Sequence, residues 1–250
     1  MMTTICPVQS IPPLTRPEAA RLAQTENARV VELVRALATE DWSRPTDCPE
    51  WDVRALVSHV LGGFEAFAGI HEFVHQMRAG RRAAGDRPLI DGMTAVQVRD
   101  RADMGPAELI AGLERMGPRQ ARARRRVPRP LRRYRAKQYV AGRVEHWPLN
   151  YLLDVVLTRD TWMHRIDLAR ATDRPLWLTP GHDGRLVADV VAEWARRHGQ
   201  PFVLHLTGPA GATFAQGTDG DKLAMDAVTF CRTLSGRAEG TGLMTQQVPF

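Results

Sequence analysis

Apolar residues recur every three to four positions along four long stretches of the first 171 residues, and this spacing predicts amphipathic helices. The first helix is expected to open near residue 18, because Thr15 and Glu18 form a capping-box pair with a proline between them. Asp52 suits the N-cap of the second helix, and prolines 106 and 148 are expected to open the third and fourth. The stretch 80–88 is expected to be a polar connector. Four such helices favour a bundle.

A different pattern follows residue 173. One more amphipathic helix, three short alternating stretches typical of strands, and a closing helix succeed one another there. Asp226 suits the N-cap of the closing helix. The expected bounds are 184–198 for the first helix, 202–207, 212–216 and 222–225 for the strands, and 226–234 for the last helix.

These patterns predict the α+β fold class. A four-helix bundle is expected over residues 1–175, followed by a small α+β domain over residues 176–250. The length of 250 residues gives ample core for two such domains.

The most informative pair of residues is Asp160 and His164, which stand four positions apart in the fourth predicted helix. That spacing places a carboxylate and an imidazole on one helix face. With a third ligand from another helix, they would form a three-ligand metal site with an open position. His59 in the second predicted helix is the candidate third ligand. The alternatives are a hydrogen bond along the helix face for the pair and a structural core histidine for His59.

Residues near these three in the sequence are candidates for contact with a ligand at the open metal position or with the metal ligands themselves. Gly62 and Gly63 follow His59 by about one turn, and glycine inside a helix costs about 1 kcal/mol relative to alanine. The two glycines therefore indicate either room for a bound ligand or close packing between helices. Arg165 and Asp167 flank His164 and are candidate outer-sphere partners of the site, with surface ion pairing as the alternative.

A competing metal motif is HEFVH at residues 71–75, which has the H-E-x-x-H spacing of zinc-binding helices. If the second helix continues this far, His71 and His75 are rotated by about 120° and 160° from His59 and cannot share its metal. No convincing third ligand follows the motif, so we predict a structural role for it. The chain contains no GxSxG, GxGxxG or GxxxxGK[ST] motif, which gives no support to nucleophile-elbow, dinucleotide or P-loop chemistry.

The net charge of +6 comes from one segment. Residues 119–137 contain nine arginines, one lysine and no acidic residue, so the remainder of the chain is net negative. One interpretation of this segment is a polyanion contact. The other, which we favour, is a solvated and partly mobile connection in which Pro128 and Pro130 prevent a continuous helix. Nucleic acid is therefore not an expected partner.

Cysteine use and hydropathy favour a cytoplasmic protein. The three cysteines are widely spaced, and none has a Cys or His neighbour in the sequence at metal-ligand spacing. No apolar run is long enough to span a membrane, and the N-terminal residues lack the pattern of a secretory signal. We expect no membrane partner and either a monomer or a homodimer.

Two motifs together resemble the mycothiol-dependent maleylpyruvate isomerase family. They are TDCPEWDVRALVSH at residues 46–59 and DTWMHRID at residues 160–167, supported by LSGR at residues 234–237 and the GL…VPF ending. The resemblance covers nearly the whole chain. It implies a DinB-like N-terminal bundle that binds a divalent metal, most commonly zinc, through His59, Asp160 and His164. Isomerases of the family usually have glutamate where this chain has Asp160.

The resemblance further implies that mycothiol occupies the open metal position through its sulfur, with Gly62, Gly63 and Arg165 beside the cofactor and Arg237 holding an acidic group of the substrate. A free thiol is mostly protonated at neutral pH, and coordination to zinc deprotonates it. The resulting thiolate would catalyse cis–trans isomerisation or S-transfer on a small electrophile. A thiol-independent metal-dependent lyase or hydrolase and a non-catalytic metal-binding or ligand-binding accessory protein remain alternative interpretations. A salt bridge within the C-terminal domain is the alternative role of Arg237.

Overall fold

The computed structural model describes residues 5–140 and 142–250. It divides into two compact units, one formed by Thr15–Leu176 and the other by Trp177–Phe250 together with the described residues before Thr15. Within the described residues, no helix is long and apolar enough to cross a membrane.

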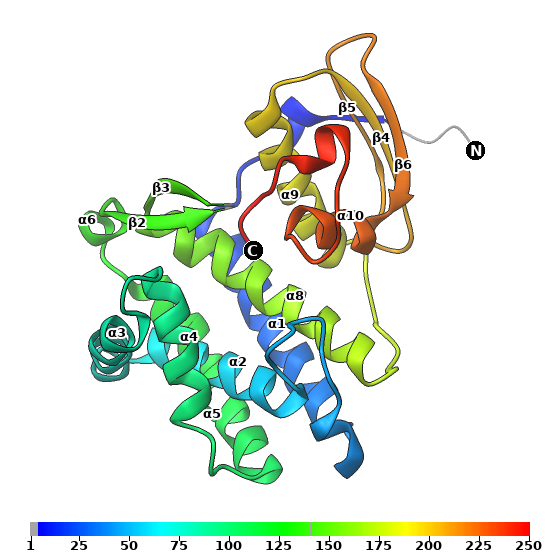
Figure 1. Cartoon of the computed structure of the whole chain (residues 1–250). Helices are drawn as coiled ribbons and strands as arrows, with labels where there is room; N and C mark the ends of the chain where they lie inside the picture. Colours follow the sequence, from blue (N-terminus) through cyan, green and yellow to red (C-terminus); the bar gives the residue numbers. More distant parts are fainter. Residues whose placement is uncertain (1–4, 141) are drawn as a thin grey trace. The chain divides into compact units, whose positions relative to one another are not determined.

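The unit Thr15–Leu176 is mainly helical, and four of its helices pack as a bundle (Figure 1). Neighbouring pairs in the bundle are α1 with α5, α5 with α2, α2 with α8, and α8 with α1. Apolar side chains from all four helices fill the core between them, among them Val34, Leu56, Leu113 and Leu168. The four helices are α1 (Arg16–Arg35), α2 (Val53–Ala68), α5 (Pro106–Arg126) and α8 (Leu157–Ala171).

Side-chain caps fix the starts of the first two bundle helices as predicted. The hydroxyl of Thr15 accepts from the backbone N–H of Glu18, whose carboxylate in turn accepts from the N–H of Thr15. Asp52 accepts from the N–H of Ala55 at 2.7 Å. The second cap matters for function, because it fixes the start of the helix that carries His59.

The prediction of a long second helix was wrong, and the polar connector predicted at 80–88 is confined to residues 85–88. Helix α2 ends at Gly69, whose extended backbone breaks the helical path, and two further helices follow: α3 (Ile70–Ala84) and α4 (Leu89–Arg99). These two pack closely because Gly92 has no side chain, since a Cβ there would overlap the carbonyl oxygen of Gly80.

The arginine-rich segment has more regular secondary structure than predicted. Helix α5 continues to Arg126, and α6 (Arg129–Arg132) and a hairpin of β2 (Arg135–Val140) and β3 (Arg143–Pro148) follow. The buried Arg124 donates to the carbonyl oxygen of Leu153 and the hydroxyl of Thr158, and Arg132 forms an ion pair with Asp154. Part of the segment therefore supports the start of α8.

The fourth predicted helix is present with an irregular beginning. A short turn of helix, α7 (Leu149–Tyr151), leads into a π-helical segment at Leu152–Val156 and then into α8. Short π-helical segments within helices are frequently found at functional sites. This one ends four residues before Asp160.

The second unit is a small α+β structure whose predicted helices and strands are confirmed. It contains α9 (Asp183–His198), β4 (Phe202–Thr207), β5 (Thr213–Gln216), β6 (Asp221–Asp226) and α10 (Ala227–Leu234). Asp226 caps α10 by accepting from the N–H groups of Val228 and Thr229.

The sheet of this unit has the strand order β1-β5-β4-β6. Strand β4 pairs antiparallel with β5 and parallel with β6. The edge strand β1 (Ile5–Pro7) pairs parallel with β5, although these residues were expected to belong to the bundle. Three residues are too few to show strand alternation, so the pairing could not be seen in the sequence.

Candidate metal site

His59 lies on α2, is nearly buried, and has its orientation set by a chain of side-chain amides. Its Nδ1 atom is 2.8 Å from Oε1 of Gln97 on α4. Gln97 donates through Nε2 to Oε1 of Gln76 on α3, and Gln76 donates through its own Nε2 to the carbonyl oxygen of Gly62 and to Glu72.

This chain of bonds selects one tautomer of His59. The carbonyl of Gly62 only accepts, so Gln76 must present its N–H₂ group there and its oxygen to Gln97. Gln97 then presents its oxygen to His59, which requires the proton on Nδ1. The lone pair of the neutral imidazole is therefore on Nε2, the arrangement of a metal-ligating histidine held by an outer partner.

Asp160 and His164 lie on one face of α8, as their spacing predicted. Oδ1 of Asp160 is 3.3 Å from Nε2 of His164, and Oδ2 of Asp167 is 3.1 Å from Nδ1 of the same ring. Burial alone would lower the pKa of His164, but the charge of Asp160 and hydrogen bonds with Asp160, Asp167 and Cys48 outweigh it and raise the pKa well above its usual range. The surroundings of this imidazole thus favour a positive charge close to it.

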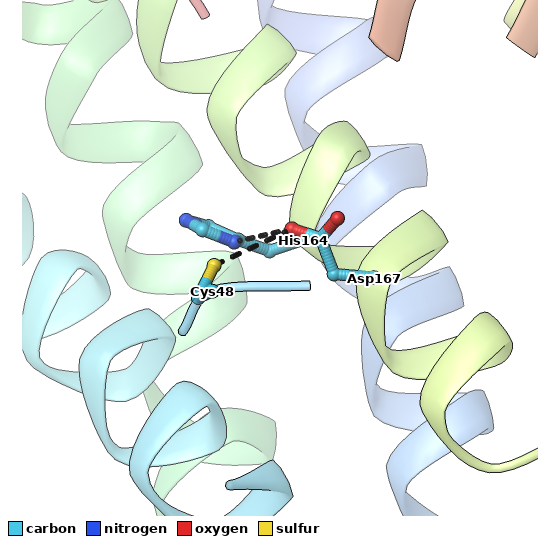
Figure 2. Close-up of side chains that lie close together, drawn as sticks. All are labelled: Cys48, His164 and Asp167. Carbon is cyan, nitrogen blue, oxygen red and sulfur yellow. Dashed lines mark hydrogen bonds and ion pairs between the residues drawn. The ribbon is translucent and has the colours of Figure 1, made fainter. Parts of the chain in front are cut away.

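Asp167 is fully buried and receives two groups at one oxygen (Figure 2). Nδ1 of His164 and Sγ of Cys48 both contact Oδ2, at 3.1 and 3.9 Å. Asp167 was predicted from the sequence as a candidate partner of the site, but Cys48 was missed, because the thiol comes from the segment before α2. Cys48 thus lies close to His164 in the folded chain, although the two residues are far apart in the sequence.

The three predicted ligands come together. One ligand atom each from His59, Asp160 and His164 lie within 4.8 Å of one another, and the two imidazole rings are 4.9 Å apart and nearly perpendicular. Metal–nitrogen and metal–oxygen bonds near 2.0–2.2 Å require donor atoms roughly this close. The donor set of two imidazoles and one carboxylate fits a divalent metal such as zinc. Both imidazoles also have an outer hydrogen-bond partner, as metal-ligating histidines usually do.

A narrow cavity adjoins this cluster. Its volume is about 20 Å³, enough for one water-sized ligand atom. The lining residues are His59, Val60, Gly63, Phe64, Gln120, Leu157, Asp160 and Thr161.

The two glycines on α2 have different surroundings. Gly63 lines the cavity, and a Cβ at this position would meet nothing within 4 Å. At Gly62 a Cβ would lie 2.6 Å from both Cβ and Cγ of Gln97. Close helix packing, rather than room for a ligand, explains Gly62.

Arg165 and Arg237 lie in different compact units. Arg165 is buried within the bundle and forms a two-point ion pair with Glu26 of α1, with N–O distances of 2.5 and 3.2 Å. This contact ties α8 to α1 and accounts for the arginine without a cofactor. Arg237 follows α10 and lines a cavity of about 530 Å³ in its own unit, together with Gly236, Glu239 and Gln247.

The HEFVH motif lies on α3, separated from His59 by the break at Gly69. His71 and His75 are exposed, and Nε2 of His75 is 2.7 Å from Oδ2 of Asp100. Among the described residues, neither histidine belongs to a group of side chains close enough to hold a metal. Gln76, the residue directly after the motif, is the one that joins the hydrogen-bond chain to His59.

The features described so far define an α+β protein whose helical bundle carries a candidate three-ligand metal site. The model of the mycothiol maleylpyruvate isomerase N-terminal domain matches residues 23–169, more than half of the chain, and the chain belongs to this family. No match was found among curated protein sequences.

Two solved structures are similar to this chain over its whole length. They are crystal structures of the mycothiol-dependent maleylpyruvate isomerase and of a mutant of that enzyme in which one histidine is replaced by alanine. Each has a TM-score of 0.57 and 16% sequence identity, with 98% of both chains covered. At this identity the likeness shows a shared fold.

Proposed function

We propose that this protein is a mycothiol-dependent metalloenzyme that catalyses cis–trans isomerisation of, or thiol transfer to, a small electrophilic substrate. The observation that carries the proposal is the convergence of His59, Asp160 and His164 within 4.8 Å, in a chain that belongs to the family. Mycothiol is the thiol on which the isomerase of both similar structures depends.

The chain's own residues are arranged to hold a cation and keep its ligands oriented. Gln97 keeps the proton of His59 on Nδ1, and Asp167 holds Nδ1 of His164. Asp160 contributes the carboxylate. A site made of this carboxylate, two neutral imidazoles and one divalent cation would carry a net positive charge. A divalent cation in this position would lower the pKa of a coordinated thiol and hold it as the thiolate, which is the nucleophilic form.

Val60, Phe64 and Leu157 make part of the cavity wall apolar. Charge interactions are stronger beside apolar groups than in bulk water, so a divalent cation held there would favour an anionic sulfur over its protonated form.

Arg237 is the candidate for binding an acidic group of the substrate. Its guanidinium can bind a carboxylate through two parallel hydrogen bonds. This assignment rests on the position of Arg237 in the LSGR motif and on the cavity that it lines in its own unit.

A thiol-independent hydrolase or lyase is the second candidate. The observation that favours it is the cavity of about 20 Å³, which suits one water molecule better than a large cofactor. In that case the three ligands would serve to activate water rather than a thiol.

Turnover separates the two candidates. Maleylpyruvate and a panel of small electrophiles should be consumed only when both a divalent metal and mycothiol are present. Chelation of the metal or omission of the thiol should each reduce the rate to the uncatalysed level. Metal-dependent turnover of any substrate in the panel at the same rate without mycothiol would instead support the thiol-independent enzyme.

A further inference from the structure

Gln120 is a buried polar side chain beside the candidate metal site, and neither the family motifs nor the ligand set account for it. It lies on α5, is 2% exposed, and lines the same cavity as His59 and Asp160. It therefore brings an amide from a third bundle helix to the position where a ligand would enter.

Asn27 on α1 determines which end of this amide remains for the cavity. Nδ2 of Asn27 donates to the carbonyl oxygen of Gly117 at 2.9 Å and to Oε1 of Gln120 at 3.1 Å. The Gly117 carbonyl only accepts, which fixes the orientation of Asn27 and hence that of Gln120. The contact with Asn27 uses Oε1 of Gln120 and leaves its Nε2 atom available to donate elsewhere.

Nε2 of Gln120 donates to no acceptor among the described residues, although the side chain is buried. This N–H₂ group is not one of the fully buried polar atoms that lack a partner, so it is accessible to a group in the adjoining cavity that accepts a hydrogen bond. Thr161 also lines the cavity, but its hydroxyl already donates to the carbonyl oxygen of Leu157 at 2.9 Å.

We propose that Gln120 is a ligand-binding residue that donates a hydrogen bond to an anion in the open position beside His59 and Asp160. The inference deepens the proposed function, on which it rests, and its ligand there is the thiolate of mycothiol. A donor at this place would favour the anionic sulfur over a neutral group, since hydrogen bonds to charged acceptors are the stronger kind.

The test is titration of the cobalt-substituted protein with azide and, separately, with mycothiol, followed by visible absorption. The variant Gln120→Met keeps the length of the side chain and removes the donor. The matched control Leu157→Met places a methionine in the wall of the same cavity and leaves Gln120 in place. A second variant, Gln120→Glu, still accepts from Asn27 but has no N–H donor.

Both Gln120 variants should keep one metal per chain and bind azide at least roughly tenfold more weakly than the parent, the loss expected for a hydrogen bond to a charged group. Leu157→Met should bind azide within about threefold of the parent, well below that loss. The cobalt spectrum of Gln120→Glu before addition of anion shows whether its carboxylate has entered the coordination sphere, in which case Gln120→Met alone decides.

Azide affinity unchanged in Gln120→Met would overturn the inference, as would a parent protein whose cobalt spectrum does not respond to azide. Equal weakening in Gln120→Met and Leu157→Met would also overturn it, since cavity shape would then be the cause. If the parent binds azide through Gln120 but does not bind mycothiol, the proposed function fails while the anion site stands.

Discussion

The side chain of Gln97 packs directly against Gly62 while its amide oxygen lies 2.8 Å from Nδ1 of His59. One residue of α4 therefore both defines the spacing between α2 and α4 and orients a candidate metal ligand. The absence of a side chain at Gly62 is what allows both.

Gly62→Ala should consequently impair both stability and metal binding. The added methyl group would overlap Gln97, and overpacking of this kind costs about 1–3 kcal/mol of unfolding free energy. Gly63→Ala is the matched control, because a methyl group there meets nothing within 4 Å and alanine favours the helix by up to about 1 kcal/mol. Urea denaturation gives the stabilities, and a metal titration gives the affinities. Equal stability of the two variants would contradict the packing account.

Asp167 should support metal binding through His164. Asp167→Ala removes the acceptor at Nδ1, and loss of such an outer partner weakens metal affinity by about 10- to 100-fold. Cys48→Ala removes weak thiol contacts, one to the same carboxylate at 3.9 Å and one to His164, and should change the affinity much less. Competition with a chromophoric chelator measures both. A larger loss in Cys48→Ala than in Asp167→Ala would indicate that the thiol is itself a ligand.

His59→Ala should abolish stoichiometric metal binding, because it removes one of three ligands. His71→Ala and His75→Ala should retain one metal per chain, since both side chains are exposed and lie outside the candidate ligand group. Elemental analysis after gel filtration gives the stoichiometry. Metal lost from either α3 variant and kept by His59→Ala would move the site to the HEFVH motif.

Two arginines of the arginine-rich segment should differ sharply in their contribution to stability. Arg124→Ala leaves the carbonyl oxygen of Leu153 and the hydroxyl of Thr158 without their donor and should cost about 2 kcal/mol or more. Arg122 is exposed on the same helix, and its replacement by alanine should change stability by less than about 0.5 kcal/mol. Thermal unfolding of both variants checks this. Equal and small effects would restore the view of the segment as a solvated connection.

The ligands could be predicted from the sequence, but most of the residues that orient them could not. Asp160 and His164 could be paired because a fixed helical repeat relates them. His59 was proposed as the third ligand from its place in the second predicted helix, and the family resemblance implied the same three residues. Gln76, Gln97 and Cys48 were missed because no local spacing connects them to the site. They reach it through the packing of α3 and α4 and the path of the segment before α2.

The same distinction between local and distant contacts separates the parts of the fold that were predicted from those that were missed. Caps at Thr15, Asp52 and Asp226 are local interactions, and each was predicted correctly. Helix α4 and strand β1 were missed, because a short amphipathic helix with two glycine contacts and a three-residue edge strand depend on partners distant in sequence. Glycine was the most ambiguous signal, since Gly62 and Gly63 are adjacent and serve different purposes.

The most direct test of the central claim is the visible spectrum of the cobalt-substituted protein titrated with mycothiol. The parent should develop a sulfur-to-cobalt charge-transfer band that saturates at one thiol per metal, with release of about one proton per thiol near neutral pH. His164→Ala should show no such band. A parent spectrum that saturating mycothiol leaves unchanged would contradict the account and favour a metalloenzyme that works without a thiol.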